Sequence, residues 1–184
     1  MFTKKIDDSL MIKQIEYTDA HQLFYVAEQS RSHLRKWLPW VDDTTTVEHT
    51  KNFIHSCEQL ANESKGLNTV ILYDDQIVGN AGFNQIDHIN KITTIGYWLA
   101  ENVQGKGIMT RVVQALTAYT FEELQFNKVE IRVAKENKKS RRIPERLGFL
   151  HEGCIRSSQY LHHTYMDIII YGLLKDEWMN QNVN

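Results

Sequence analysis

The sequence has little cysteine and proline, and no long hydrophobic run. Cys57 and Cys154 lie far apart and share no CxxC or Cys/His spacing, so neither a disulfide nor a metal site is expected. The longest apolar run, residues 166–174, is interrupted by an aspartate and a glycine and is far shorter than the roughly 20 residues of a membrane helix. These shortages predict a cytoplasmic protein with free thiols, no membrane segment and no bound metal.

An excess of charge of either sign is also missing. The formal net charge is -2, which gives no whole-protein attraction to nucleic acid, and we expect no direct nucleic acid binding. The 184 residues, 42% of them hydrophobic, suffice for one packed core and are few for two. Without an internal repeat or a linker in the chain, we predict a single domain over residues 1–184.

Apolar periodicity predicts an alternation of strands and helices that is neither a regular βα repeat nor a pure hairpin array. Asp74-Asp75 joins two apolar runs as a hairpin would, and the next strand is expected to pair antiparallel with the second of them. We therefore predict an α/β fold, an α+β mixed sheet with helices on both faces. Strands are expected at 10–15, 67–73, 76–83, 91–99, 128–133, 149–160 and 165–174, and helices at 18–29, from 46, at 111–124 and at 138–147.

A glycine-rich loop, Gln104-Gly105-Lys106-Gly107-Ile108-Met109-Thr110, lies between a strand-like run and a helix-like run. A glycine turn that opens a helix leaves backbone N–H groups unpaired, and these can hold a phosphate. The loop has neither the GxGxxG spacing of dinucleotide folds nor the GK[ST] ending of a Walker loop, which makes NAD and ATP poor choices. Taken alone, it indicates either a different phosphorylated cofactor or an ordinary turn.

Several separated sequence blocks carry a resemblance that covers essentially the whole chain. They are residues 95–99, 104–110, 137–140 and 147–149, followed by Glu152-Gly153, and they occur in the right order. Through these blocks the chain resembles the GNAT acetyltransferases, and within them the RimJ/RimL branch that acetylates the N-terminal amines of ribosomal proteins. The resemblance implies the GNAT acyl-CoA N-acyltransferase fold, with about seven mostly antiparallel strands flanked by about four helices.

The resemblance also implies acetyl-CoA as co-substrate, with the loop amides on its pyrophosphate. Gln104 and Gly107 satisfy the family pattern Gln/Arg-x-x-Gly-x-Gly/Ala, while Met109 replaces its last small residue. Asn137 is expected at the pantetheine arm and Ser140 near the thioester sulfur, although both residue types also suit a helix N-terminus. The expected cofactor-binding residues are Leu99, Val103, Gln104, Gly105, Lys106, Gly107, Ile108, Met109, Thr110, Asn137 and Ser140.

Acetyl transfer by direct attack needs an uncharged amine, a polarised thioester carbonyl and a donor for the leaving thiolate. The resemblance implies that a bulged strand, which we place around residues 97–99, supplies an N–H to the carbonyl. It also implies that Ser140 protonates or hydrogen-bonds the leaving thiolate. Where the family carries a glutamate base, this chain has Gln159, which can orient an amine but cannot take its proton. Either water carries the proton away, or one of Asp87, His88, His162 and His163 serves.

The acceptor is the least determined part of the prediction. Trp37 and Trp40 are expected to line its groove, with core packing as the alternative. An α-amine has a pKa of roughly 8 and a lysine-type amine one of about 10, so an N-terminal amine is the easier acceptor. The resemblance favours a protein N-terminus. A polyamine or aminoglycoside and, in a different class, a catalytically weak acetyl-CoA-binding module are the alternatives.

Two surface features allow more than one interpretation. A basic cluster could meet the cofactor's 3′-phosphate or an acidic substrate, or be a solvated helix face. The apolar strand 167–174 could pack inside the protein or across a homodimer interface. The cluster comprises Lys135, Lys138, Lys139, Arg141 and Arg142.

Overall fold

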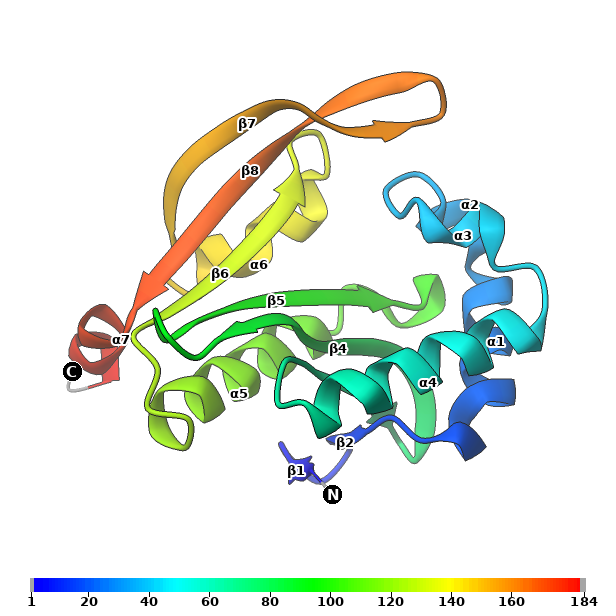
Figure 1. Cartoon of the computed structure of the whole chain (residues 1–184), viewed down its shortest axis with the longest axis horizontal. Coiled ribbons are helices and arrows are strands. Elements are labelled where there is room, and N and C mark those ends of the chain that lie inside the picture. Colours follow the sequence, from blue (N-terminus) through cyan, green and yellow to red (C-terminus); the bar gives the residue numbers. More distant parts are fainter. Residues whose placement is uncertain (1, 183–184) are drawn as a thin grey trace.

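One sheet of eight strands runs through the computed structural model, which describes residues 2–182 (Figure 1). The strands lie in the order β1-β2-β3-β4-β5-β6-β8-β7, and every neighbouring pair is antiparallel except β5 and β6. The mixed, mostly antiparallel sheet is therefore confirmed. In chain order the elements are β1 (Thr3–Lys5), β2 (Leu10–Gln14), α1 (Ala20–Gln29), α2 (Arg31–Leu34), α3 (Trp40–Asp43), α4 (Val47–Asn62), β3 (Leu67–Tyr73), β4 (Gln76–Asp87), β5 (Ile92–Leu99), α5 (Ile108–Glu122), β6 (Lys128–Ala134), α6 (Lys138–Arg146), β7 (Leu150–Leu161), β8 (Thr164–Leu174) and α7 (Lys175–Asn182).

Local sequence accounts for most of these elements. The turn between β3 and β4 places Asp74 and Asp75 at φ 49° and 60°, the left-handed geometry of a two-residue hairpin that aspartate tolerates. In α4, Thr50, Ile54 and Cys57 recur at helical spacing and are the side chains that this helix buries. The predicted hairpin and the antiparallel pairing of β5 with β4 are both confirmed.

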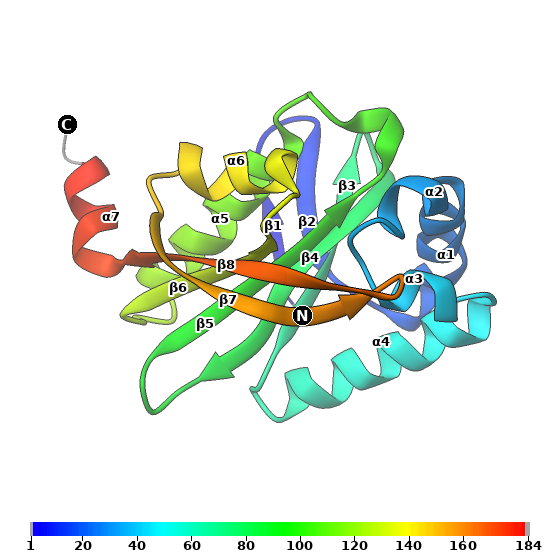
Figure 2. The ribbon, with the colours of Figure 1, turned by 90° about the horizontal axis from the view of Figure 1, so that it is seen from above.

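Helices cover both faces of the sheet (Figure 2). On one face, α1 and α4 pack against β3 and β4 through a cluster that includes Leu23, Ile54 and Val70. On the other, α5 lies along the sheet, with Val112 and Leu116 fully buried in the largest hydrophobic cluster. Because α5 is fixed along its whole length by this core, its first turn has a defined place at the sheet edge.

The sheet opens between β5 and β6. Their parallel pairing extends only from Ile92↔Lys128 to Ile95↔Ile131, and beyond it the strands diverge. The strands β6, β8 and β7 form an arm whose hairpin tip reaches the segment around α2 and α3 (Figure 1). Two hydrogen bonds hold the tip there: Gln159 Nε2 donates to the Trp37 carbonyl at 3.0 Å, and His162 Nε2 lies 2.7 Å from the Arg35 carbonyl. The wedge between the strands is thereby bridged at its wide end.

Residues 2–182 contain one strand and three α-helices more than expected. The strand β1 is only three residues long, and α2 and α3 have four residues each, which is too short for a hydrophobic period to register. The helix α7 has no periodic apolar stripe and begins directly after β8. Tertiary contacts rather than local patterns define these four elements.

Both cysteines carry free thiols, Cys57 buried and Cys154 exposed. Burial raises the pKa of the Cys57 thiol to about 12. Within residues 2–182, no cluster of three or more His, Cys, Asp or Glu side chains has metal-binding geometry. In the same part of the chain, no helix combines the length and the apolar character needed to cross a membrane.

Candidate active site

A cavity of about 370 Å³ occupies the wedge between β5 and β6. Its walls come from the two strands, the start of α6, the connection between α2 and α3, and the β7–β8 hairpin. Four residues expected at the site, Trp37, Asn137, Ser140 and Gln159, line this single cavity although they are widely separated in sequence. The topology therefore brings the two ends of the expected site together.

The open edge of β5 directs two backbone N–H groups into the wedge. The Lys91 carbonyl accepts hydrogen bonds from the start of β6, whereas the Ala100 N–H donates to the Val78 carbonyl of β4. Backbone groups alternate in direction along a strand, so the N–H groups of Tyr97 and Leu99 point away from β4. No strand pairs with them there, because the pairing with β6 ends at Ile95. These donors suit an oxygen that gains negative charge.

The bulge predicted around residues 97–99 is wrong. These residues pair regularly with β4, and the register shift lies instead between Phe83 and Gln85, at Asn84 of β4. A Cβ at Gly96 would come within 2.2 Å of the Asn84 amide, so this glycine makes room for the bulged side chain. The wedge therefore opens because β6 turns away, with no irregularity in β5 itself.

In the described chain, the glycine loop leaves a run of backbone N–H groups without partners at the start of α5. Gly105 and Gly107 have φ values of +80° and +70°, and Gly107 is the N-cap of α5 without a side-chain cap. The first hydrogen bond of the helix runs from Arg111 N to the Gly107 carbonyl. Within residues 2–182, none of the N–H groups from Gly105 to Thr110 has a partner. A pyrophosphate fits such a set of donors at the positive end of a helix dipole.

The side chains of the loop secure it from behind. Ile108 and Met109 are buried in the main core, and Val103 and Leu99 pack against that core. Lys106 Nζ lies 5.1 Å from the centroid of the Tyr73 ring. The loop therefore offers its backbone to a ligand, while most of its side chains serve packing.

Gln104 is anchored by a histidine that the sequence did not single out. Its Nε2 lies 2.6 Å from His33 Nε2, a ring nitrogen that accepts this hydrogen bond in the neutral form. Burial lowers the pKa of His33, and the nearby Glu101 carboxylate only partly opposes this effect. The half-buried position of His33 therefore favours the neutral ring that holds Gln104.

Ser140 belongs to a small hydrogen-bonded unit with Tyr97. The Ser140 hydroxyl donates to the Tyr97 oxygen at 3.2 Å, and the Tyr97 hydroxyl donates to the Ser140 carbonyl at 3.2 Å. Pro144 explains why that carbonyl is available, since proline lacks the N–H that residue 144 would otherwise offer to residue 140 in α6. Tyr97 replaces the missing helix hydrogen bond and connects β5 to α6 across the wedge.

Asn137 caps the same helix. Its Oδ1 accepts a hydrogen bond from Ser140 N at 3.2 Å. This is the N-cap contact expected of an asparagine at a helix N-terminus. The side chain also lines the cavity. Capping and a position at the cofactor arm are therefore compatible, because the cap uses the oxygen and leaves the amide nitrogen available.

The two tryptophans have different environments. Trp37 lines the cavity, and its carbonyl receives the Gln159 hydrogen bond. Trp40 does not line it. The Trp40 ring packs against Trp98, with ring centroids 5.9 Å apart, and is 36% exposed. The groove position expected for Trp40 stays a prediction, since its ring packs on Trp98 of β5 outside this cavity.

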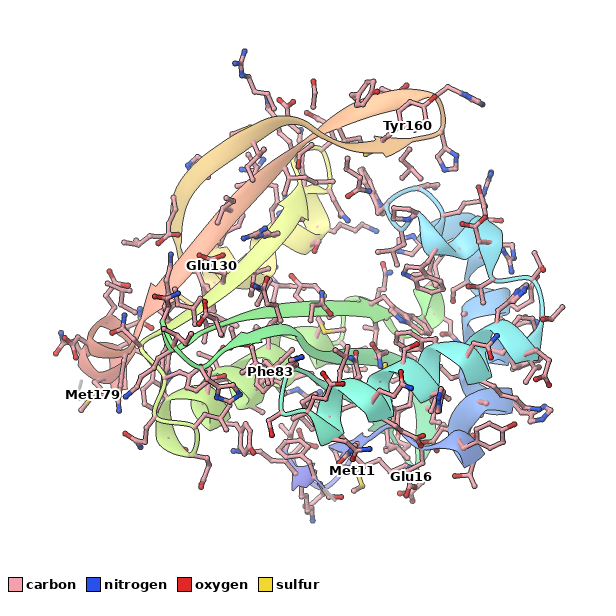
Figure 3. The ribbon with its side chains drawn as sticks, viewed as in Figure 1. Met11, Glu16, Phe83, Glu130, Tyr160 and Met179 are labelled. Carbon is pink, nitrogen blue, oxygen red and sulfur yellow. The ribbon has the colours of Figure 1, made fainter. Side chains whose placement is uncertain are left out.

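None of the four alternative bases is among the residues that line the cavity. Asp87 accepts hydrogen bonds from the turn after β4, and His88 contacts the Ser64 carbonyl far from the wedge. His162 contacts the Arg35 carbonyl, and His163 lies 3.5 Å from the hydroxyl of Tyr160 at the hairpin tip, which Figure 3 labels. The described cavity wall thus holds no carboxylate and no imidazole.

The basic cluster divides into paired and unpaired side chains. Lys135 contacts Asp167 at 3.3 Å, and Arg141 donates to the Tyr171 hydroxyl at 2.8 Å. Within the described chain, the side chains of Lys138, Lys139 and Arg142 have neither a hydrogen bond nor an ion pair. All three lie on α6, beside the start of the helix that lines the cavity.

Comparison with known proteins agrees with this geometry. The acetyltransferase (GNAT) domain family matches residues 9–150. The Bacillus subtilis (strain 168) protein named "Putative ribosomal N-acetyltransferase YdaF" is 35% identical over 179 residues, covering 97% of this chain and 98% of that one. The ribosomal-protein-serine acetyltransferase of Escherichia coli (strain K12) is 26% identical, covering 95% and 97%. A solved structure of RimL, a ribosomal L7/L12 α-N-protein acetyltransferase in complex with coenzyme A, superimposes with a TM-score of 0.92 at 26% identity, covering 96% and 99%.

Proposed function

This chain belongs to the GNAT acetyltransferase family, and we propose that it acetylates the N-terminal α-amine of a protein, with a ribosomal protein as the first substrate to test. The observation that carries the proposal is the bridged wedge. Unpaired backbone donors and Ser140 lie on one side of it, and Trp37 and Gln159 lie on the other. A chain end can enter such a cavity with its amine leading.

The side of the site formed by the glycine loop, the open edge of β5 and the start of α6 would hold acetyl-CoA, the acetyl donor, and we call it the donor side. The free N–H groups from Gly105 to Thr110 would hold its pyrophosphate, and the absence of a Cβ at Gly105 and Gly107 lets the diphosphate approach the backbone. Lys138, Lys139 and Arg142 are cations without a partner in the described chain and would meet the 3′-phosphate. Asn137 would offer its amide nitrogen to the pantetheine arm.

The thioester supplies the activated acetyl group, and the protein supplies donors for the charges that develop. The N–H groups of Tyr97 and Leu99 would stabilise negative charge on the carbonyl oxygen. The Ser140 hydroxyl, which donates its one hydrogen to the Tyr97 oxygen in this structure, would turn from that oxygen to donate to the departing sulfur. Together these groups would stabilise the carbonyl oxygen and the leaving thiolate, the two parts of the reaction that do not require a base.

Gln159 would orient the acceptor amine through its Oε1, since its Nε2 is already bonded to the Trp37 carbonyl. With no carboxylate or imidazole in the described wall, water would carry the amine proton to solvent. This route favours an α-amine, whose reference pKa is roughly 8, over amines near 10. The names of the relatives, which refer to ribosomal proteins, point to the same class of acceptor.

The test is acetylation by the purified full-length protein of peptides with free or blocked N-termini, of spermidine and of an aminoglycoside. Thiol release from acetyl-CoA gives the rate, and mass spectrometry locates the acetyl group. We expect modification of the α-amine and none of the blocked peptides. Turnover of a small amine at a rate far above that of every peptide would overturn the protein-substrate proposal while leaving the family assignment intact.

A further inference from the structure

Arg132 is the only charged side chain among the described residues that line the wedge cavity. It follows Ile131, the last residue of β6 that pairs with β5, so it stands where the two strands begin to separate. Its Nη2 lies 3.2 Å from Glu130 Oε2, and its other guanidinium nitrogens, Nε and Nη1, have no partner in residues 2–182. The guanidinium therefore retains donors that an incoming molecule can use.

Glu130 forms an ion pair with Arg132 but does not add a negative charge to the cavity lining. This carboxylate, which Figure 3 labels on β6, also contacts Lys128 Nζ at 3.0 Å, and its side chain is 15% exposed. The two cations on either side of it hold the pKa of Glu130 below its ordinary value despite its burial. Glu130 is thus ionised and engaged on both sides, and it is not a lining residue. What the cavity presents to an acceptor is the free side of Arg132.

We propose that Arg132 is a specificity-determining residue that selects acceptors carrying a carboxylate close to the reactive amine, namely protein N-termini with an acidic residue among the first few positions. This inference rests on the proposed function, whose acceptor class it narrows. It also predicts that polyamines and aminoglycosides are poor acceptors.

The shape and the positive charge of the Arg132 guanidinium are the physical basis of this selection. Two free N–H positions match a carboxylate, and a partner of this kind is oriented as well as attracted. A polycationic acceptor would place a second positive charge beside Arg132, in a wall that offers it no carboxylate. Because the Arg132 side chain is 49% exposed, the selection is expected to be moderate and sensitive to salt.

The experiment compares three peptides that differ only at the second residue, which is Glu, Gln or Arg. For the wild-type protein we expect kcat/KM for the Glu peptide to exceed that for the Arg peptide about fivefold, mainly through KM, the size expected for one exposed charge contact. Raising the ionic strength should reduce this ratio. In Arg132→Gln the ratio should fall below twofold, and Arg132→Lys should restore part of it.

Arg156→Gln is the matched control. Arg156 lies on the same arm, is exposed like Arg132 and loses the same charge, but it does not line the cavity. The control should keep the wild-type ratio. Coenzyme A affinity and the melting temperature, measured for each variant, should match the wild type and so exclude a folding defect.

Two outcomes separate this inference from the proposed function. If peptides are acetylated but the Glu to Arg ratio is near one, or if Arg132→Gln leaves the ratio unchanged, the role of Arg132 is wrong and the N-terminal activity stands. If no peptide is acetylated while anionic small amines are preferred over spermidine, and that preference disappears in Arg132→Gln, the role of Arg132 stands and the proposed function fails.

Discussion

One side of the wedge presents mainly backbone groups, and the other presents mainly side chains. The donor side consists mostly of backbone: unpaired N–H groups on the glycine loop and on the open edge of β5. The acceptor side consists of side chains from segments that only the fold brings together, Trp37 from the α2–α3 connection, Arg132 from β6 and Gln159 from the hairpin. A backbone site serves one invariant ligand, whereas a side-chain wall changes its ligand by substitution without a change of fold.

This difference predicts that substitutions on the two sides should affect different kinetic constants. Changes on the donor side should alter turnover or coenzyme A affinity for every acceptor alike. Changes on the acceptor side should alter KM for the acceptor and its specificity, with coenzyme A binding preserved. The four predictions below test that separation, from the largest expected effect to the smallest.

Ser140→Ala tests the donor side where it reaches the reacting sulfur. We expect kcat to fall about hundredfold, the lower range for the loss of a proton donor, with coenzyme A affinity within about threefold of wild type. Steady-state kinetics and calorimetric binding of coenzyme A measure the two effects. Unchanged turnover would remove Ser140 from the chemistry. Tyr97→Phe, which releases the Ser140 hydroxyl, should give a smaller loss in the same direction.

Trp37→Ala tests the acceptor side and keeps the backbone carbonyl that binds Gln159. Loss of the ring should raise the acceptor KM about tenfold, the scale of burying part of an aromatic side chain, and leave coenzyme A affinity unchanged. Trp40→Ala is the control, since Trp40 packs on Trp98 outside the cavity. A weakened affinity for coenzyme A in Trp37→Ala would contradict the separation of the two sides.

Gly107→Ala tests the backbone nature of the donor side. A Cβ at Gly107 meets nothing within 4 Å, so its cost is the left-handed backbone, about 1 kcal/mol. We expect coenzyme A to bind about fivefold more weakly because the loop relaxes. Gly153→Ala is the matched control, as Gly153 also has open space but no positive φ. Equal effects of the two substitutions would show that the loop geometry is unimportant.

The smallest effect concerns His33 and pH. Its pKa is lowered in the folded state, so the stability from its neutral form is present above about pH 6.5, the unfolded value, and is lost as the pH falls through the folded pKa. Below that range the protonated ring cannot accept from Gln104. From pH 7.5 to 5.5, wild type should lose up to about 1 kcal/mol relative to His33→Asn, measured by denaturant unfolding. Parallel pH curves for the two proteins would exclude this role.

The donor side was largely predictable from sequence because its information is local. Glycines at positions 105 and 107, placed between a strand and a helix, specify a left-handed turn and a free helix N-terminus wherever the chain folds. Pro144 acts just as locally, since it lacks the N–H that would otherwise donate to the Ser140 carbonyl in α6. Each of these deductions involves residues fewer than five positions apart.

The acceptor side could not be predicted in the same way. Arg132 appears in sequence as one polar residue of an alternating strand, and its place at the point of separation depends on where β6 leaves β5. Trp37 and Trp40 are equivalent in sequence, and only the start of α3 decides which of them faces the cavity. The partner of His33, Gln104, is 71 positions away. The bulge was misplaced for the same reason, since Asn84 and Gly96 meet only across two strands.

By itself the sequence determined the mixed sheet, the left-handed glycine turn before a helix and the family resemblance, because periodicity, glycine geometry and motif order are properties of short segments. Tertiary structure alone decided which strand edge opens, which tryptophan lines the wedge and which charged residue stands in its wall. Those features depend on pairing between distant strands and on the docking of the hairpin onto the α2–α3 connection. Such contacts are fixed by the packing of the whole core and have no signature in any one segment.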